Sequence, residues 1–311
     1  MKCRICCNET DNHIFDVREM MFGSRELFRY YQCSHCQCLQ IECIPNNISN
    51  YYPNNYYSYD DSKIHLSLLK KFLIRARNSY VVLGKNFFGK LLHTKFPGSK
   101  FDFLKSLKIT KDTSIIDVGC GAGSLLYSLR EIGMENILGV DPYNEKDIEY
   151  ENGLVIQKKQ ISDIDGKWDM VMFHDSFEHM PDPLAVLQYV SELLKPGGHC
   201  IIRIPTVTSY AWEHYGVNWV QIDAPRHFFL HSVKSMKILA DQSGLELRDV
   251  VYDSTEFQFI GSEAYIKDIP LRDERAYSQF SKLEISHLIN RASELNAAKQ
   301  GDHAIFYLNK L

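Results

Sequence analysis

The sequence predicts an α/β fold, in which a largely parallel sheet carries a ligand site and a small cysteine-rich ribbon precedes it. The first observation is the stretch "SIIDVGCGAG", Ser114 to Gly123, where a short apolar strand opens into a turn of alternating glycines. An amphipathic segment, "SLLYSLREIG", follows it, and a second strand, "NILGVD", ends in Asp141. This is a βαβ unit, and doubly wound sheets bind ligands at the carboxyl ends of such strands. The second observation is that six of the nine cysteines lie within the first 38 residues.

Composition restricts the class of protein. The 311 residues suffice for one large domain and a smaller appendage. The formal net charge of -4, without long basic runs, argues against a nucleic acid as the main partner. No apolar run approaches the roughly 20 residues that span a bilayer, and the first residues do not resemble a signal peptide. We therefore expect a cytoplasmic protein with no membrane span, and the sequence leaves its oligomeric state open.

The N-terminal cysteines have the spacing of a metal site. "CRICC" and "CSHCQC" each contain a CxxC pair, and two such pairs supply the four thiolates of a closed tetrahedral zinc site. We predict a structural Zn²⁺ held by Cys3, Cys6, Cys33 and Cys36. The two extended runs between the pairs would form a ribbon too small to be stable without metal. The alternative is a set of reduced thiols in a small sheet.

Three regions are expected along the chain: a zinc-ribbon-like module over residues 1–45, a tyrosine-rich linker and helical segment over 46–108, and the ligand-binding domain over 109–311. The helical segment carries leucines at helical spacing from Leu66 onward. The linker is unusually aromatic, and we expect it to pack against the main domain, with a roof over the substrate pocket as the alternative. Its tyrosines are Tyr51, Tyr52, Tyr56, Tyr57 and Tyr59.

The glycine spacing discriminates between ligands. The turn reads GxGxG, with Gly119, Gly121 and Gly123, whereas a dinucleotide fingerprint reads GxGxxG. The third glycine of that fingerprint is replaced here by Ser124, and no GK[ST] follows that would make a P-loop. The turn therefore favours a ligand other than a dinucleotide.

This part of the chain resembles the class I S-adenosylmethionine-dependent methyltransferases in three features: the acid before the turn, the glycines of the turn and the acid that ends the next strand. The resemblance runs from about Ile109 to Lys310. It implies a Rossmann-like, seven-stranded methyltransferase sheet of order 3214576 with the last strand antiparallel. The corresponding segments are residues 114–118, 136–141, 153–159, 168–174, 199–205, 245–253 and 302–310.

The resemblance also implies how S-adenosyl-L-methionine would be held. Asp117 would orient the methionine amino group, Asp141 would accept hydrogen bonds from the ribose hydroxyls, Asp163 would reach the adenine, and His174 would form a wall of the pocket. The full set of expected cofactor contacts is Asp117, Gly119, Cys120, Gly121, Gly123, Asp141, Asp163 and His174. A purely structural turn is the alternative.

Two segments are candidates for the acceptor side. "DSFEHMPDP" places Glu178 and His179 after the fourth strand, and "HYGVNWVQIDAPRHFFLHS" contains Trp219, Arg226 and His227. The methyl group of the cofactor is already activated, but a hydroxyl or enolisable carbon still needs a base, and histidine has a suitable pKa. Glu178, His179 and His227 are the predicted catalytic residues. Trp219 is expected to stack on a ring and Arg226 to hold a phosphate or carboxylate; structural roles are the alternative for all five.

The combination of a zinc ribbon with this core looks like the methyltransferases of bacterial sugar and glycan biosynthesis. It implies a small-molecule acceptor, namely a sugar or nucleotide sugar, methylated on oxygen or carbon. Those enzymes have a further C-terminal domain, whereas this chain ends at Leu311 on the expected seventh strand, which weakens the case for carbon methylation. The alternatives are an RNA or protein methyltransferase that uses the ribbon for recognition and a non-catalytic scaffold.

Overall fold

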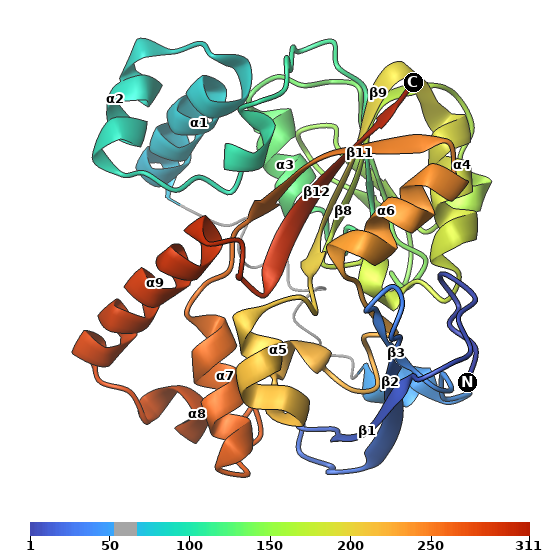
Figure 1. The fold of residues 1–311 in the computed structure, drawn as a ribbon. Coiled ribbons are helices and arrows are strands. Elements are labelled where there is room, and N and C mark those ends of the chain that lie inside the picture. The colour runs from blue at the N-terminus through green and yellow to red at the C-terminus, as the bar shows by residue number, and fades with distance from the viewer. Residues whose placement is uncertain (53–66) are drawn as a thin grey trace.

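The computed structural model describes residues 1–52 and 67–311, which fold around two β-sheets (Figure 1). The larger sheet has eight strands and the smaller has four. The linker residues Tyr56, Tyr57 and Tyr59, together with Leu66, lie outside the described residues.

The large sheet is mixed, with the strand order β11-β12-β9-β8-β4-β5-β7-β6. Its strands are β4 (Ile115–Val118), β5 (Ile137–Val140), β6 (Ile148–Glu149), β7 (Val155–Gln157), β8 (Trp168–His174), β9 (Leu194–Pro205), β11 (Leu245–Tyr252) and β12 (His303–Lys310). Parallel pairing joins β4 to β5 and β8, while β12 runs antiparallel to both β9 and β11. The sheet thus has one strand more than the seven expected. The addition is β6, an edge strand of two residues that is too short to show a periodic pattern.

Helices cover both faces of this sheet because successive strand residues alternate between two apolar cores. Ile115 and Met172 pack with α1 and α3 on one face, whereas Ile116 and Phe173 pack with α4 and α6 on the other. The four helices are α1 (Leu68–Leu83), α3 (Ser124–Glu131), α4 (Pro183–Leu193) and α6 (Val233–Gln242). Helix α4 begins after Asp182, whose side chain accepts the backbone N–H of Ala185.

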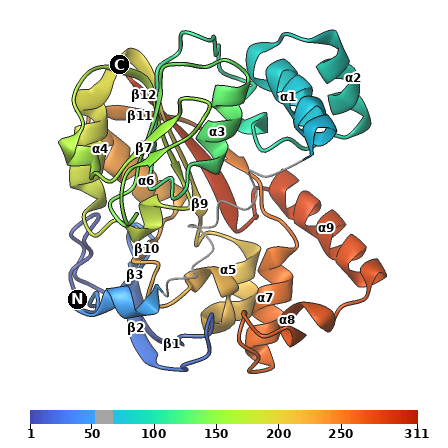
Figure 2. The same cartoon turned by 180° about the vertical axis from the view of Figure 1, so that it is seen from behind.

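The small sheet contains the two expected ribbon strands and two short strands that the sequence did not predict. Its order is β1-β2-β3-β10, where β1 is His13–Arg18, β2 is Leu27–Gln32, β3 is Leu39–Ile41 and β10 is Phe229–Leu230. Strand β10 belongs to the chain beyond β9, and it pairs antiparallel with β3. The N-terminal ribbon is therefore hydrogen-bonded to a segment nearly 190 residues away in sequence, as Figure 2 shows from behind.

The remaining helices lie around the edges of the sheets. They are α2 (Phe87–Lys95), α5 (Tyr210–Tyr215), α7 (Phe257–Ile266), α8 (Arg275–Ser278) and α9 (Lys282–Ala297). Short 3₁₀ helices occur at η1 (Ile48–Tyr51), η4 (Asp102–Leu104), η5 (Ile161–Asp163), η6 (Phe177–His179), η7 (Gly216–Asn218) and η8 (Val220–Ile222). Across the described ranges 1–52 and 67–311, no helix is both long and apolar enough to cross a bilayer.

Candidate active site

The glycine turn between β4 and α3 lies close to its neighbours. Gly119, Gly121 and Gly123 have φ values of +70°, +54° and +73°, which favour glycine. A Cβ atom on Gly119 would lie 2.6 Å from Cβ of Ser176, and one on Gly123 would lie 2.4 Å from Cδ1 of Ile156. The glycines therefore let the turn approach the loop after β8 on one side and β7 on the other.

Asp141, which directly follows β5, holds this turn. Its carboxylate accepts the backbone N–H of Gly121 at 2.8 Å and that of Tyr143 at 2.9 Å. Burial raises the pKa of Asp141. Each carboxylate oxygen has a second lone pair, so the residue can still accept hydrogen bonds from a ligand.

Asp117 and His174 have buried polar atoms that make no hydrogen bond within the described part of the chain. Asp117 Oδ1 lies 3.8 Å from His174 Nδ1, and the Asp117 side chain is almost entirely buried. Among the described residues, Asp117 Oδ1 and both ring nitrogens of His174 are buried without a hydrogen-bond partner. Buried polar atoms are normally hydrogen-bonded. Next to the glycine turn, these orphaned atoms fit the polar amino-acid end of S-adenosylmethionine.

The other two expected cofactor residues have contacts of their own. The Cys120 sulfur would lie 2.6 Å from a Cβ placed on Gly139, so the thiol faces β5, where burial raises its pKa. Asp163 accepts the backbone N–H of Gln160 at 3.1 Å and thereby caps η5. The adenine contact of Asp163 stays a prediction.

The loop after β8 connects the turn to the acceptor side. Ser176 donates its hydroxyl to the Val118 carbonyl at 2.7 Å, and Glu178 follows within η6. Glu178 is fully buried, and within the described residues neither of its carboxylate oxygens has a hydrogen-bond partner. Burial and the nearby Asp175 charge raise the pKa of Glu178, which favours its neutral form.

Glu178, His179 and His227 meet at this point. Their ligand-type atoms all lie within 4.8 Å of one another, and His227 Nε2 is 3.8 Å from Glu178 Oε1. His179 Nδ1 lies 2.8 Å from the Arg226 carbonyl, and His227 Nδ1 lies 2.7 Å from the Gln221 carbonyl. Because a carbonyl only accepts, these contacts assign the proton to Nδ1 and leave both Nε2 atoms with a free lone pair.

Burial keeps both histidines neutral. It lowers the pKa of His179 to about 4 and also lowers the pKa of His227. The Tyr52 hydroxyl lies 3.2 Å from His179 Nδ1, and the Tyr52 ring stacks on Tyr143, two residues after Asp141. For Tyr52, the structure agrees with the expected packing of the linker over this site.

Glu178, His179 and His227 line a pocket of about 680 Å³, including its open mouth. The lining also contains four charged groups joined in a ring by ion pairs, which the sequence did not predict. His303 lies 2.6 Å from Asp175 and 2.9 Å from Asp253, and Arg203 binds the same two carboxylates at 3.0 Å and 2.6 Å. Burial and Arg203 oppose protonation, but the two carboxylates raise the pKa of His303 to about 9.

No local sequence signal identifies His303. It starts β12, whose antiparallel pairing with β9 places His303 opposite Pro205, at the edge of the sheet where the parallel strands end. Only the long-range strand order brings this side chain to the pocket.

Two expected acceptor contacts are wrong. Trp219 is fully buried, and its indole N–H donates to Asp302 at 2.9 Å, so no ring face is open to a ligand. Arg226 is also fully buried, with Nη2 at 3.0 Å from Glu19 and 2.5 Å from Asp223. The guanidinium is therefore occupied by carboxylates of the chain itself, because an isolated buried charge would be too costly.

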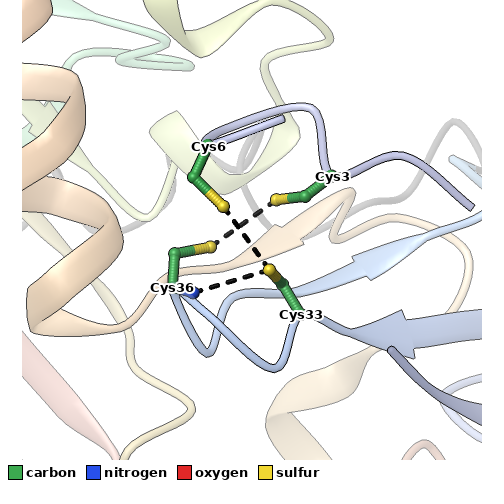
Figure 3. Close-up of side chains that lie close together, drawn as sticks. All are labelled: Cys3, Cys6, Cys33 and Cys36. Atoms are coloured by element: carbon green, nitrogen blue, oxygen red, sulfur yellow. Dashed lines mark hydrogen bonds between the residues drawn. The ribbon is translucent and has the colours of Figure 1, made fainter. Parts of the chain in front are cut away.

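The four N-terminal cysteines converge as their spacing predicts, which Figure 3 shows. The Sγ atoms of Cys3 and Cys36 are 3.5 Å apart, as are those of Cys6 and Cys33, and all four lie within 4.8 Å. Zinc–sulfur bonds of about 2.3 Å would place neighbouring sulfurs roughly 3.8 Å apart, so the cluster has the size of a tetrahedral zinc site. Cys38 does not belong to it, since its sulfur lies 3.9 Å from His231 Nδ1.

The ribbon also contacts the segment that carries His227. The Tyr30 hydroxyl, fully buried in β2, donates to the His227 carbonyl at 2.8 Å. Glu19, which follows β1, forms the buried ion pair with Arg226. The position of His227 thus depends on contacts from the first 30 residues.

Comparisons with known proteins agree on one class. A family model described as a methyltransferase domain matches residues 92–250, which contain the glycine turn, Glu178, His179 and His227. The ubiquinone biosynthesis O-methyltransferase of Colwellia psychrerythraea is 39% identical over 98 residues, covering 28% of this chain and 39% of that protein. The protein of the same name from Haemophilus ducreyi is 30% identical over 157 residues, covering 44% of this chain and 66% of that protein.

The matched region thus spans less than two thirds of these relatives. A solved S-adenosylmethionine-dependent methyltransferase from Archaeoglobus fulgidus is 21% identical, with a TM-score of 0.43, and covers 71% of this chain and 99% of that one. The family match covers half of the chain and confirms the predicted enzyme class, an S-adenosylmethionine-dependent methyltransferase. The chain belongs to the methyltransferase-domain family.

Proposed function

We propose that this protein transfers the methyl group of S-adenosylmethionine to a hydroxyl of a small polar acceptor. The observation that carries the proposal is the pair of neutral histidines, His179 and His227, whose free Nε2 atoms lie in a pocket next to the glycine turn. Ser176 joins the two halves, since its loop packs on Gly119 and leads directly to Glu178.

The cofactor would be held by groups of the turn and its neighbours. Asp117 and His174 offer their orphaned polar atoms to its amino-acid end, and Asp141 offers its remaining lone pairs to the ribose hydroxyls. When bound, the cofactor supplies a methyl carbon attached to a positively charged sulfur, which an oxygen nucleophile can attack. The chain's contribution is then to position the acceptor, exclude water and remove one proton.

We assign proton removal to His227. Its Nδ1–H is fixed on the Gln221 carbonyl, so Nε2 can accept the hydroxyl proton as the oxygen bonds to the methyl carbon. The resulting imidazolium would be balanced by the carboxylate of Asp223, whose Oδ2 lies 3.8 Å from His227 Nε2, while Glu178 stays protonated beside it. His179, whose ring centroid is 4.8 Å from that of His227, would orient the acceptor.

The pocket lining favours a polyhydroxylated acceptor such as a sugar or nucleotide sugar. The lining is rich in hydrogen-bonding groups, including Gln221, Thr255 and Gln258, and Phe257 is its single aromatic residue apart from histidines within the described chain. The names of the relatives support transfer to oxygen and make an aromatic hydroxyl the second candidate.

We further propose that Cys3, Cys6, Cys33 and Cys36 hold a structural Zn²⁺ in a module formed by residues 1–45. Backbone N–H groups of Ile5 and Cys36 point to the sulfurs of Cys3 and Cys33, at 3.4 Å and 3.5 Å, which stabilises thiolates. Four thiolates saturate the metal, so its role is to hold the ribbon, and through Tyr30 and Glu19 to hold the loop of His227.

The test is methyl transfer from radiolabelled S-adenosylmethionine to a panel of nucleotide sugars, free sugars and catechols. Label in a sugar product would support the preferred acceptor, and label in catechols alone would replace it with the second candidate. Label only in tRNA or protein, tested in parallel, would refute a small-molecule acceptor.

A further inference from the structure

Helices α1 and α2 form a hairpin whose apolar side chains face solvent. Apolar residues at helical spacing usually face the core of a protein, yet six apolar residues in or next to these two helices are well exposed. Figures 1 and 2 show α2 at the outer edge of the molecule, with α1 between it and α3. The exposed fractions are 70% for Leu69, 60% for Phe72, 86% for Phe87, 44% for Phe88, 58% for Leu91 and 56% for Phe96.

Exposed side chains of the two helices meet each other. The rings of Phe72 on α1 and Phe88 on α2 have centroids 6.2 Å apart, which joins the exposed residues of the two helices. The helices approach closely at Gly89, where a Cβ would lie 2.0 Å from the Ala76 carbonyl oxygen. The hairpin therefore presents its apolar residues on a tightly packed pair of helices. Large exposed apolar patches usually mark an interaction site.

The same segment is strongly basic. Residues 67–101 contain eight lysines and arginines and no aspartate or glutamate, although the whole chain has a formal net charge of -4. The basic residues are Lys70, Lys71, Arg75, Arg77, Lys85, Lys90, Lys95 and Lys100. An occupant of this surface must therefore be anionic and must also accept phenylalanine and leucine side chains.

We propose that the α1–α2 hairpin docks on the surface of an anionic lipid bilayer. Phenylalanine and leucine side chains enter the boundary between headgroups and acyl chains, while flanking lysines bind lipid phosphates. A nucleic acid would satisfy the lysines but would leave Phe87 and Leu91, the most exposed apolar residues of α2, without an apolar environment. No described residue of α1 or α2 lines the pocket that contains His179 and His227, so this surface is not part of that pocket.

The experiment is co-sedimentation of the full chain with vesicles of phosphatidylcholine alone or with about one third phosphatidylglycerol, at low and high salt. We expect binding to the anionic vesicles only, weakened by salt. The variant F87S/L91S removes the apolar contribution, and K85Q/K90Q removes two charges and is expected to lower the partition coefficient about 30-fold, at roughly fivefold per lysine. A matched control, K282Q/L283S, changes an exposed pair on α9 and should bind like the parent.

Each variant is first checked by its thermal unfolding and S-adenosylmethionine affinity, both of which should equal those of the parent. No sedimentation with either vesicle would overturn the proposal, as would equal binding to neutral and anionic vesicles. Retention of an RNA oligonucleotide without vesicle binding, or a dimer that F87S/L91S dissociates without vesicle binding, would also overturn it. If F87S/L91S is unstable, K85Q/K90Q alone decides, because exposed lysines contribute little to folding.

Discussion

The two halves of the candidate active site are built in different ways. The cofactor side comes from a single βαβ segment, in which Asp117, the three glycines and Asp141 lie within 25 residues. The acceptor side is assembled from the loop after β8, the segment around His227, the end of β11 and the start of β12, with support from the N-terminal ribbon. A local pattern can therefore reveal the cofactor side, whereas the acceptor side exists only in the folded chain.

The largest effect is expected at the acceptor side. His227→Gln removes the proposed proton acceptor and should lower turnover by about 10²–10⁴-fold. Calorimetry should find unchanged S-adenosylmethionine affinity, because His227 does not belong to the glycine turn. His35→Gln, in the exposed knuckle of the ribbon, is the control and should retain full activity. Parent-like turnover of His227→Gln would refute the assignment.

Substitution of Glu19 tests whether the N-terminal ribbon stabilises the loop that carries His227. Glu19→Ala leaves Arg226 buried with one carboxylate fewer, which should lower the free energy of unfolding by about 3–5 kcal/mol. Urea denaturation measures the change. Glu9→Ala, which breaks an exposed ion pair with Lys2, should change it by less than about 1 kcal/mol. Equal effects of the two substitutions would show that the Arg226 contact does not hold the loop.

The cofactor side should respond more weakly, and in binding rather than turnover. Asp141→Ala removes a buried acceptor and should weaken S-adenosylmethionine binding by roughly 1.5–3 kcal/mol, about 10- to 150-fold, measured by calorimetry. Asp165→Ala, at an exposed position after η5, should leave the affinity unchanged. An Asp141 variant with parent affinity would remove Asp141 from the cofactor site.

The ring formed by His303, Asp175, Asp253 and Arg203 is expected to make stability depend on pH without affecting cofactor binding. The pKa of His303 is raised to about 9, so protonation favours the folded state. Its contribution is complete below the ordinary histidine pKa, near pH 6.5, and is lost as the pH rises towards 9. Melting temperatures should therefore fall over this interval in the parent and fall less in His303→Gln. The same slope in both proteins would contradict a charged His303.

The same comparison explains which parts of the fold and of the site could be predicted from the sequence. The strand, turn and helix around Asp117 were predictable because glycine spacing and apolar periodicity are local, and so was the four-cysteine cluster. The ring of His303, Asp175, Asp253 and Arg203 was not, because strand order alone assembles it. For Trp219 and Arg226, the sequence predicted contacts with a ligand that the structure does not allow. Polar and aromatic residues near a site look like ligand contacts in sequence, but their burial gave them partners within the chain.

Strand β10 has a consequence for how this protein can be divided. Its two residues belong to the methyltransferase half of the chain but form an edge strand in the sheet of the cysteine ribbon. A domain boundary near residue 46 would therefore cut through a hydrogen-bonded sheet. A fragment that lacked the first 45 residues would expose the apolar side chains of Phe229 and Leu230 along an unpaired edge. Anyone transplanting this acceptor pocket onto another scaffold must therefore carry the ribbon along with it.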